Sequence, residues 1–206
     1  PQLYSIVAVW IKFHNLIADN LKQIHPNLDN EAIFYETRRF VIAVYQNIWY
    51  NEVLPLILSP EVLVVHEIIS SKSCFESSID PSVSSEFVAS AARYFHNFIH
   101  DDYKIHFKNG SSEKILLRKL FYYDTEVIDF KGVIAELLTT PWNTASIGNE
   151  ISNYLFSTNA HGLDLRALDI QTERDFGVAT YCDALYYFNL TDGKCVEGFQ
   201  DIERFI

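Results

Sequence analysis

Residues 29–55, DNEAIFYETRRFVIAVYQNIWYNEVLP, indicate the fold class of this chain. Apolar side chains recur in this stretch at spacings of three and four residues, which is the period of one face of an α-helix. Asp29 is the expected N-cap, and Glu31 lies in the first turn, near the positive end of the helix dipole. We therefore predict one long helix over residues 30–53, which stops before Pro55 because the residue ahead of a proline disfavours helical backbone.

A second helical pattern precedes this stretch. From residue 3 to residue 24 the apolar residues again recur every three or four positions, and Pro26 interrupts the pattern. Two long helices that are joined by a short connection pack side by side in opposite directions. Residues 1–55 are therefore expected to form an antiparallel helical hairpin.

The rest of the chain predicts shorter helices and few strands. Residues 69–85 are rich in serine and predict a surface loop, and residues 108–112 predict a turn. Helices are expected over residues 84–99, 113–122, 129–138, 145–156, 163–172 and 178–188. The predicted fold class is therefore all-α, or mostly α, without internal repeats.

The composition excludes several functional classes. The chain has 206 residues, of which 49% are apolar, and its formal net charge is −11 without any run rich in Lys or Arg. A protein that binds nucleic acid or an anionic membrane surface would carry a basic patch. The longest apolar stretch, residues 53–65, is interrupted by Pro55, Pro60 and Glu61 and is too short to cross a bilayer. We expect no nucleic-acid partner and no transmembrane segment in these residues.

Two features predict that the sequence is a piece of a longer protein. It contains no methionine, and it begins at Pro1 inside a helical pattern. We expect residues 1–206 to form part of one domain that is incomplete at both ends: the hairpin of residues 1–55, a functional helix within residues 80–110, and short helices over residues 111–206.

Cysteine and asparagine residues give limited information about the cellular compartment. Cys182 and Cys195 could close a short loop and leave Cys74 unpaired, but three free buried thiols explain the count equally well. Two sequons, Asn109-Gly-Ser and Asn189-Leu-Thr, favour a secreted or luminal glycoprotein, although such triplets also arise by chance.

The histidines offer the strongest candidates for chemistry. His96 and His100 are four residues apart, with Asp101, Asp102 and His106 beyond them, a pattern that a zinc or iron site could use but that is weak by itself. His96 follows large apolar residues, and Arg93 lies one turn earlier. This setting suits an iron porphyrin, since the imidazole can bind the metal and the guanidinium can pair with a propionate. From the residues alone, a buried structural histidine beside a surface arginine is the more common explanation.

A resemblance changes this balance. Residues 81–96, PSVSSEFVASAARYFH, are similar to the proximal-histidine motif of the animal haem peroxidases. Three other blocks occur in the order that this family has: FHNLIA at residues 13–18, the stretch of residues 29–55 quoted above, and GLDLRALDIQTERDFG at residues 162–177. The resemblance covers nearly the whole chain, and within the family residues 45–48 and 80–88 look most like dual oxidases.

The resemblance implies a role for individual residues. His96 matches the proximal ligand of the haem iron, and Arg93 matches the arginine that pairs with a haem propionate. Asp169 stands where the family usually has an asparagine that accepts the N–H of the proximal histidine. A carboxylate there would make the imidazole more electron-donating and lower the reduction potential of the iron. Four apolar residues match the walls of the haem pocket: Leu155, Phe156, Leu165 and Leu168.

The resemblance also implies an activity for the longer protein. It would bind haem b and use hydrogen peroxide to oxidise small organic or halide donors, in an extracellular or luminal setting. The parent could be a membrane protein of the dual-oxidase type. The distal catalytic residues and a calcium loop would precede Pro1, so we assign no catalytic residue within the chain and expect it to be inactive alone.

Three departures from the family pattern support an alternative. Thr172 replaces an arginine near the haem, Phe95 replaces a glycine beside the ligand, and Phe176 replaces the histidine of an Arg-Asp-His-Gly signature. These changes are compatible with a degenerate, haem-free peroxidase-homology domain that acts as a structural or interaction module. Both interpretations remain open on the sequence.

Overall fold

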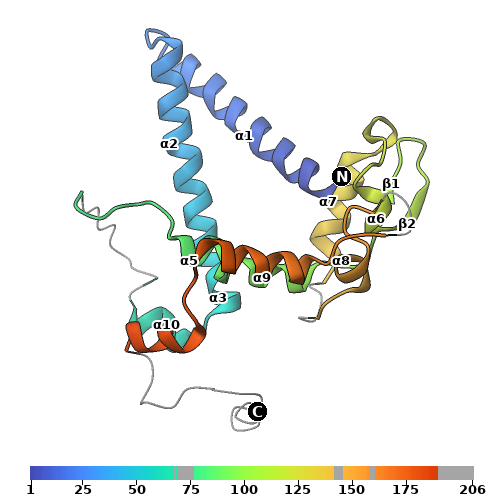
Figure 1. The fold of residues 1–206 in the computed structure, drawn as a ribbon. Helices are drawn as coiled ribbons and strands as arrows, with labels where there is room; N and C mark the ends of the chain where they lie inside the picture. Colours follow the sequence, from blue (N-terminus) through green and yellow to red (C-terminus); the bar gives the residue numbers. More distant parts are fainter. Residues whose placement is uncertain (67, 69–76, 142–145, 158–160, 190–206) are drawn as a thin grey trace. The chain divides into compact units, whose positions relative to one another are not determined.

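The computed structural model describes residues 1–66, 68, 77–141, 146–157 and 161–189 (Figure 1). These residues are mostly helical, with one sheet of two strands, which confirms the predicted fold class. The chain divides into two compact units. The first comprises residues 1–80 and 129–138, and the second comprises residues 81–128 and 139–206.

Two long helices dominate the first unit. Helix α1 (Gln2–Ile24) and helix α2 (Asn30–Ile48) run in opposite directions from the turn that joins them (Figure 1). Asp29 caps α2 by accepting a hydrogen bond from the N–H of Ala32 at 2.8 Å. Aromatic rings join the two helices, with Trp10 5.3 Å from Tyr45 between ring centroids. The two helices thus pack against each other in opposite directions.

The end of α2 differs from the prediction. The α-helix ends at Ile48, and the chain continues as a π-helix (Trp49–Val53) and then as α3 (Leu54–Ile57), so the helical backbone passes through Pro55. Pro55 lies in the first turn of α3, where its missing N–H has no partner to lose. The prediction that helix stops before Pro55 was therefore wrong. The first unit also contains α4 (Pro60–Val65) and α7 (Phe130–Thr139), the latter close to its predicted bounds.

A β-hairpin replaces part of a predicted helix in the second unit. Strand β1 (Asp102–His106) pairs antiparallel with β2 (Ser112–Leu116), and α6 (Leu117–Leu120) follows. The prediction of a helix over residues 113–122 was therefore wrong over its first half. Ile105 and Ile115 are buried, and Tyr103 pairs with Ile115 in the register. The pairing of the two strands and the burial of Ile105 and Ile115 outweigh the local helical pattern.

The predicted helix over residues 84–99 is divided in two. Helix α5 (Ser85–Ala89) ends at Ser90, whose φ of −123° and ψ of −75° are not helical, and a 3₁₀-helix, η2 (Ala91–Phe98), follows. A 3₁₀-helix has three residues per turn, so residues three apart lie directly above one another. Arg93 and His96 therefore lie on the same face of η2.

Three further α-helices follow in the second unit: α8 (Asn149–Asn153), α9 (Leu165–Phe176) and α10 (Tyr181–Tyr187). A short 3₁₀-helix, η3 (Thr125–Val127), follows α6. Helix α9 extends four residues beyond its predicted end, to Phe176, and Gly177 caps it with a left-handed φ of +65°. The core of this unit includes the buried residues Ala89, Ile105, Ile115, Leu120, Ile128, Ile151 and Leu155.

Several predictions concern residues outside the described part. Part of the predicted loop of residues 69–85 lies there, as does residue 145, where a helix was predicted to start. Cys74 and Cys195 also lie outside the described residues.

Cys182 is bonded in a disulfide, so the interpretation of three free thiols was wrong. In the part of the chain that the structure describes, none of the helices combines the length and the apolar character that a membrane span requires.

Candidate functional site

His96 and Asp169 form the centre of the candidate site. Nδ1 of His96, on η2, lies 2.9 Å from Oδ2 of Asp169, on α9. The Asp169 side chain is 9% exposed and that of His96 is 24% exposed, so the pair is largely shielded from water. Because an ionised carboxylate only accepts hydrogen bonds, the contact places the proton on Nδ1 and leaves the lone pair on Nε2. Among the described residues, Nε2 has no hydrogen-bond partner.

The start of α9 positions the carboxylate. Asp164 caps the helix by accepting hydrogen bonds from the N–H groups of Arg166 at 2.9 Å and Ala167 at 3.4 Å. This fixes the first turn, from which Arg166 and Asp169 emerge three residues apart on one face. Nη1 of Arg166 lies 3.3 Å from the same Oδ2 that contacts His96. The carboxylate that contacts the imidazole therefore also pairs with a guanidinium.

Arg93 lies one 3₁₀ turn before His96. Its Nε donates a hydrogen bond to the carbonyl oxygen of Val88 at 3.0 Å, which anchors the guanidinium to the end of α5. Its two Nη groups have no partner among the residues that the structure describes. They could therefore bind an anion beside His96, such as a carboxylate.

The four predicted wall residues have different environments. Leu155 is buried and forms an isolated β-bridge with Leu163, just ahead of α9. On α9, Leu165 is half-buried and Leu168 is exposed. Phe156 adopts a left-handed φ of 55° and packs against Phe121, with 4.6 Å between the ring centroids. The structure thus places Leu165 and Leu168 on the helix of Asp169, and it places Phe156 against α6.

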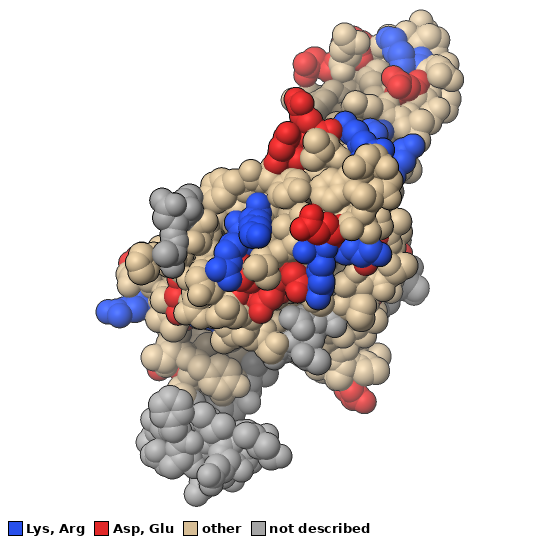
Figure 2. Space-filling model, turned by 90° about the vertical axis from the view of Figure 1, so that its right-hand side faces the viewer, with Lys and Arg blue, Asp and Glu red and all other residues tan. Residues whose placement is uncertain are grey.

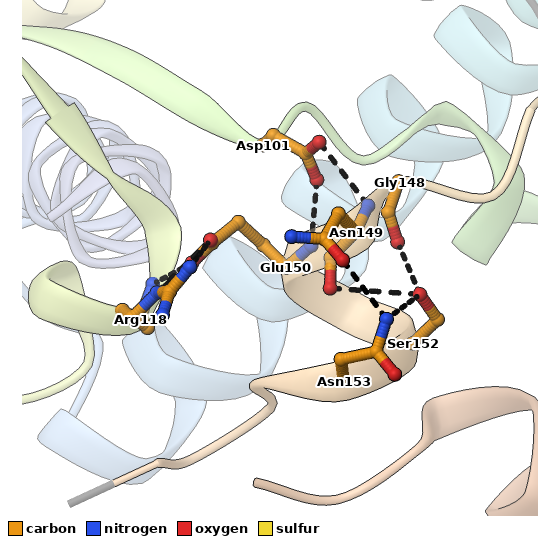
Figure 3. Close-up of polar contacts among 7 residues, drawn as sticks. All are labelled: Asp101, Arg118, Gly148, Asn149, Glu150, Ser152 and Asn153. Carbon is orange, nitrogen blue, oxygen red and sulfur yellow. Dashed lines mark hydrogen bonds and ion pairs between the residues drawn. The ribbon is translucent and has the colours of Figure 1, made fainter. Parts of the chain in front are cut away.

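A capping contact that the sequence did not predict links the His96 segment to α8. Asp101 accepts hydrogen bonds from the N–H groups of Asn149 at 3.1 Å and Glu150 at 2.8 Å (Figure 3). Gly148, the N-cap residue, has no side chain with which to cap the helix. A Cβ at Gly148 would lie 3.0 Å from Cγ of Asp101, so the absence of a side chain makes room for this carboxylate.

A buried ion pair completes this network. Glu150 is 2% exposed, and Nε of Arg118 lies 2.9 Å from both of its carboxylate oxygens (Figure 3). The backbone N–H of Arg118 donates to Oε2 at 3.0 Å, and its Nη2 donates to Oε1. The guanidinium carbon also lies 3.4 Å from the centroid of the Tyr154 ring. The hydrogen bonds that Arg118 donates to Glu150 raise the pKa of the guanidinium, which therefore stays charged, and the pair links α6 to α8.

Among the described residues, His96 and His100 do not form a shared metal site of the kind that their spacing suggested. Within the described ranges, no group of three or more His, Cys, Asp or Glu side chains could hold a metal ion. Asp101 caps α8, and the ring of His100 packs edge-on against Tyr103 at 5.8 Å. The four-residue spacing fails because η2 ends at Phe98, so the two histidines do not share an α-helical face.

Charged side chains form local pairs on the surface. On the face drawn in Figure 2, Lys and Arg side chains lie close to Asp and Glu side chains, and most of the remaining surface is uncharged. Across the β-hairpin, Nζ of Lys114 lies 2.9 Å from Oδ1 of Asp102, its diagonal neighbour in the register. Exposed pairs of this kind contribute little to stability.

Comparison with known proteins relates nearly the whole chain to one family. The family described as animal haem peroxidase matches residues 1–205. The chain belongs to the animal haem peroxidase family. The sequence is 33% identical to the peroxidase of Drosophila melanogaster over 98% of this chain and 29% identical to the myeloperoxidase of Mus musculus over 88%. It spans 31% and 26% of those two proteins.

A solved structure shares the fold of this chain. Peroxidase A from Dictyostelium discoideum superimposes on 87% of the chain with a TM-score of 0.65 and 24% identity, and the match covers 34% of that protein. The predicted peroxidase fold is therefore confirmed by both the family and the structure.

The three departures from the family motif are now placed in the peroxidase fold. Phe95 lies next to His96 on η2, and its ring centroid is 6.4 Å from that of Tyr94 and 6.3 Å from that of Phe98. The hydroxyl of Thr172 donates to the carbonyl oxygen of Leu168 at 2.8 Å, so it bonds to its own helix. Phe176 is exposed at the end of α9.

Proposed function

We propose that this chain supplies the proximal side of a haem b site in a peroxidase that uses hydrogen peroxide to oxidise small organic or halide donors. The observation that supports this most strongly is the 2.9 Å contact between Nδ1 of His96 and Oδ2 of Asp169. Histidines that bind a metal usually donate their other ring N–H to a carboxylate or carbonyl, which fixes the tautomer and the orientation of the ring. His96 has this arrangement, with Nε2 left to bind the iron.

The surrounding residues fit such a group. Asp169 would make the imidazole a stronger electron donor, and Arg166 on the same oxygen would moderate this effect. The free Nη groups of Arg93 would pair with a propionate, because Arg93 and His96 lie on one face of η2. The apolar wall would come from Leu155, Phe156, Leu165 and Leu168. When bound, the haem would supply the iron at which peroxide reacts.

The activity and setting of the whole protein are also part of the proposal. The chain spans about a third or less of the relatives reported above, so distal acid–base groups and a calcium loop would lie outside residues 1–206. An extracellular or luminal location is supported by the disulfide of Cys182, since such bonds persist in oxidising compartments. It also agrees with the name of another relative, the chorion peroxidase of Drosophila melanogaster. A membrane parent of the dual-oxidase type remains a prediction from the sequence.

A haem-free structural module is the second candidate. It is favoured by Thr172, which provides no charge near the site and directs its hydroxyl back to Leu168. Phe95 favours it as well, because a bulky residue, which packs against Phe98, precedes His96 where the family motif has a glycine.

The absorption spectrum of the full-length protein after addition of haem distinguishes the two candidates. We expect an intense Soret band that His96→Ala abolishes. His100→Ala is the matched control, because His100 lies four residues away and packs against Tyr103. This control should keep the band. A folded protein without a Soret band, or a band that survives His96→Ala unchanged, would exclude the proposal and favour the haem-free module.

A further inference from the structure

The tip of the β-hairpin has a tightly defined turn over residues 107–111. Phe107 donates its N–H to the carbonyl oxygen of Ser111 at 2.9 Å, and Gly110 donates its N–H to the carbonyl oxygen of Phe107 at 2.9 Å. Gly110 adopts a φ of +85°, which favours glycine at the bulge of such a turn. The sequence Phe-Lys-Asn-Gly-Ser therefore encodes one compact surface loop.

Within this turn, the two ends of the Asn109 amide have different environments. Its Oδ1 accepts hydrogen bonds from the backbone N–H of Ser111 at 2.9 Å and from the Ser111 hydroxyl at 2.7 Å. The backbone N–H can only donate, so this contact identifies the oxygen and directs Nδ2 elsewhere. Nδ2 has no hydrogen-bond partner among the described residues, and the Asn109 residue is exposed.

We propose that Asn109 carries an N-linked glycan and that the first sugar of this glycan packs against Phe107. Asn109-Gly110-Ser111 is a sequon without proline. The donor would be a lipid-diphosphate-linked oligosaccharide. The bond between Nδ2 and the anomeric carbon forms, and the bond between that carbon and the diphosphate oxygen breaks. The lipid diphosphate leaves with the electron pair, Nδ2 loses one proton, and no oxidant or reductant is needed.

The surroundings of Asn109 leave room for a sugar. A surface cavity of about 450 Å³ is lined by Phe107, Lys108, Asn109, Ser111, Glu126 and Val127. A Cβ added at Gly110 would find no atom within 4 Å, so the turn itself is open to solvent. The glycan would therefore extend from the hairpin without displacing any packed side chain.

Phe107 gives the cavity an aromatic wall. Its ring packs at 6.2 Å against that of Tyr123, and the Phe107 residue is half-buried, so part of it still faces solvent. A pyranose ring has an apolar face of C–H groups, which gains free energy by covering an aromatic surface. Phe107 and Asn109 both line this cavity, so a sugar attached to Asn109 would lie beside the Phe107 ring.

The second sequon provides a comparison inside the same chain. Asn189 has a left-handed φ of 55°, and the two residues that complete its sequon lie outside the described part. The structure therefore gives a positive argument only for Asn109. The disulfide of Cys182 is consistent with passage through an oxidising compartment, where such glycans are attached.

Peptide mapping of the full-length protein secreted from eukaryotic cells tests the attachment. After treatment with peptide-N-glycosidase in heavy-oxygen water, Asn109 should be recovered as aspartate carrying the heavy label. Asn109→Gln and Ser111→Ala should each remove the same glycan, and Asn189→Gln should leave it in place. A secreted, folded protein whose Asn109 peptide is entirely unmodified would overturn the proposal.

Thermal unfolding before and after enzymatic removal of the glycan tests the packing on Phe107. We expect Tm of the unaltered protein to fall by a few degrees on deglycosylation. In Phe107→Leu, which keeps an apolar side chain against Tyr123, the fall should be much smaller. An equal fall in both proteins would overturn the packing. Neither test depends on haem binding, so they are independent of the proposed peroxidase function.

Discussion

Asp169 holds His96 through a single oxygen, because Oδ2 contacts Nδ1 at 2.9 Å and also receives Nη1 of Arg166 at 3.3 Å. One carboxylate oxygen thus serves both the imidazole and a guanidinium. The consequence is that the orientation of His96 depends on a residue 73 positions away in the sequence.

Replacement of Asp169 should separate the orientation of His96 from its electronic character. Asp169→Asn keeps an oxygen that accepts the Nδ1 proton but removes the charge. We therefore expect haem to bind while the reduction potential of the iron becomes more positive, as spectroelectrochemical titration would measure. Asp169→Ala loses the acceptor and should weaken haem binding about 10–100-fold, measured by titration of the apoprotein. Equal potentials in the wild type and Asp169→Asn would show that the carboxylate has no electronic role.

The buried carboxylate of Glu150 should be important for the stability of the second unit. Glu150→Ala removes the partner of Arg118 and leaves a cavity between α6 and α8. We expect Tm to fall by roughly 5–10 °C in calorimetry of the full-length protein. Glu36→Ala is the matched control, since Glu36 forms an exposed pair with Arg39, and it should change Tm by only about 1 °C. Similar changes in the two variants would contradict a structural role for the buried pair.

Gly162 and Gly110 should respond differently to the same substitution. A Cβ at Gly162 would lie 2.5 Å from the carbonyl carbon of Tyr154 and 2.8 Å from the carbonyl oxygen of Asn153, and this backbone cannot move aside without disturbing the bridge of Leu155. Gly162→Ala should therefore cost about 3 kcal/mol of unfolding free energy. Gly110→Ala meets no atom, and its left-handed φ should cost about 1 kcal/mol. Urea unfolding of both variants measures the difference, and a smaller loss in Gly162→Ala would be evidence against the close approach.

Tyr103 should make stability depend on pH in the alkaline range. Burial raises the pKa of its phenol above the ordinary value of 10.0, and Asp102 adds to this, while the hydrogen bond from His100 opposes it. The folded protein therefore holds the phenol proton more tightly than the unfolded chain does. Its contribution to stability is complete below pH 10 and is lost as the pH rises through the raised pKa.

Phenolate absorption and urea unfolding at several alkaline pH values test this effect. Tyr103→Phe should be less stable at neutral pH, because the N–H of His100 loses its acceptor, but it should lose less stability as the pH rises. A parallel loss in the variant and the wild type would assign the alkaline effect to other groups.

The sequence by itself determined the helical hairpin and the family. Periodic apolar residues, the Asp29 cap and Pro26 act within one or two helical turns, so local patterns suffice to predict them. The motif around His96 and the block around Asp169 pointed to the candidate site, because the order of motifs and their residue types can be read without the positions of the residues in space.

Only the tertiary structure decided the β-hairpin, the break at Ser90 and the network of Asp101, Glu150 and Arg118. The strand β2 has a helical pattern locally, and it becomes a strand because β1 pairs with it and buries Ile115. Asp101 and Arg118 contact the start of α8 from 49 and 32 residues away. Capping and charge pairing across such separations depend on how the chain folds back, which no local propensity encodes.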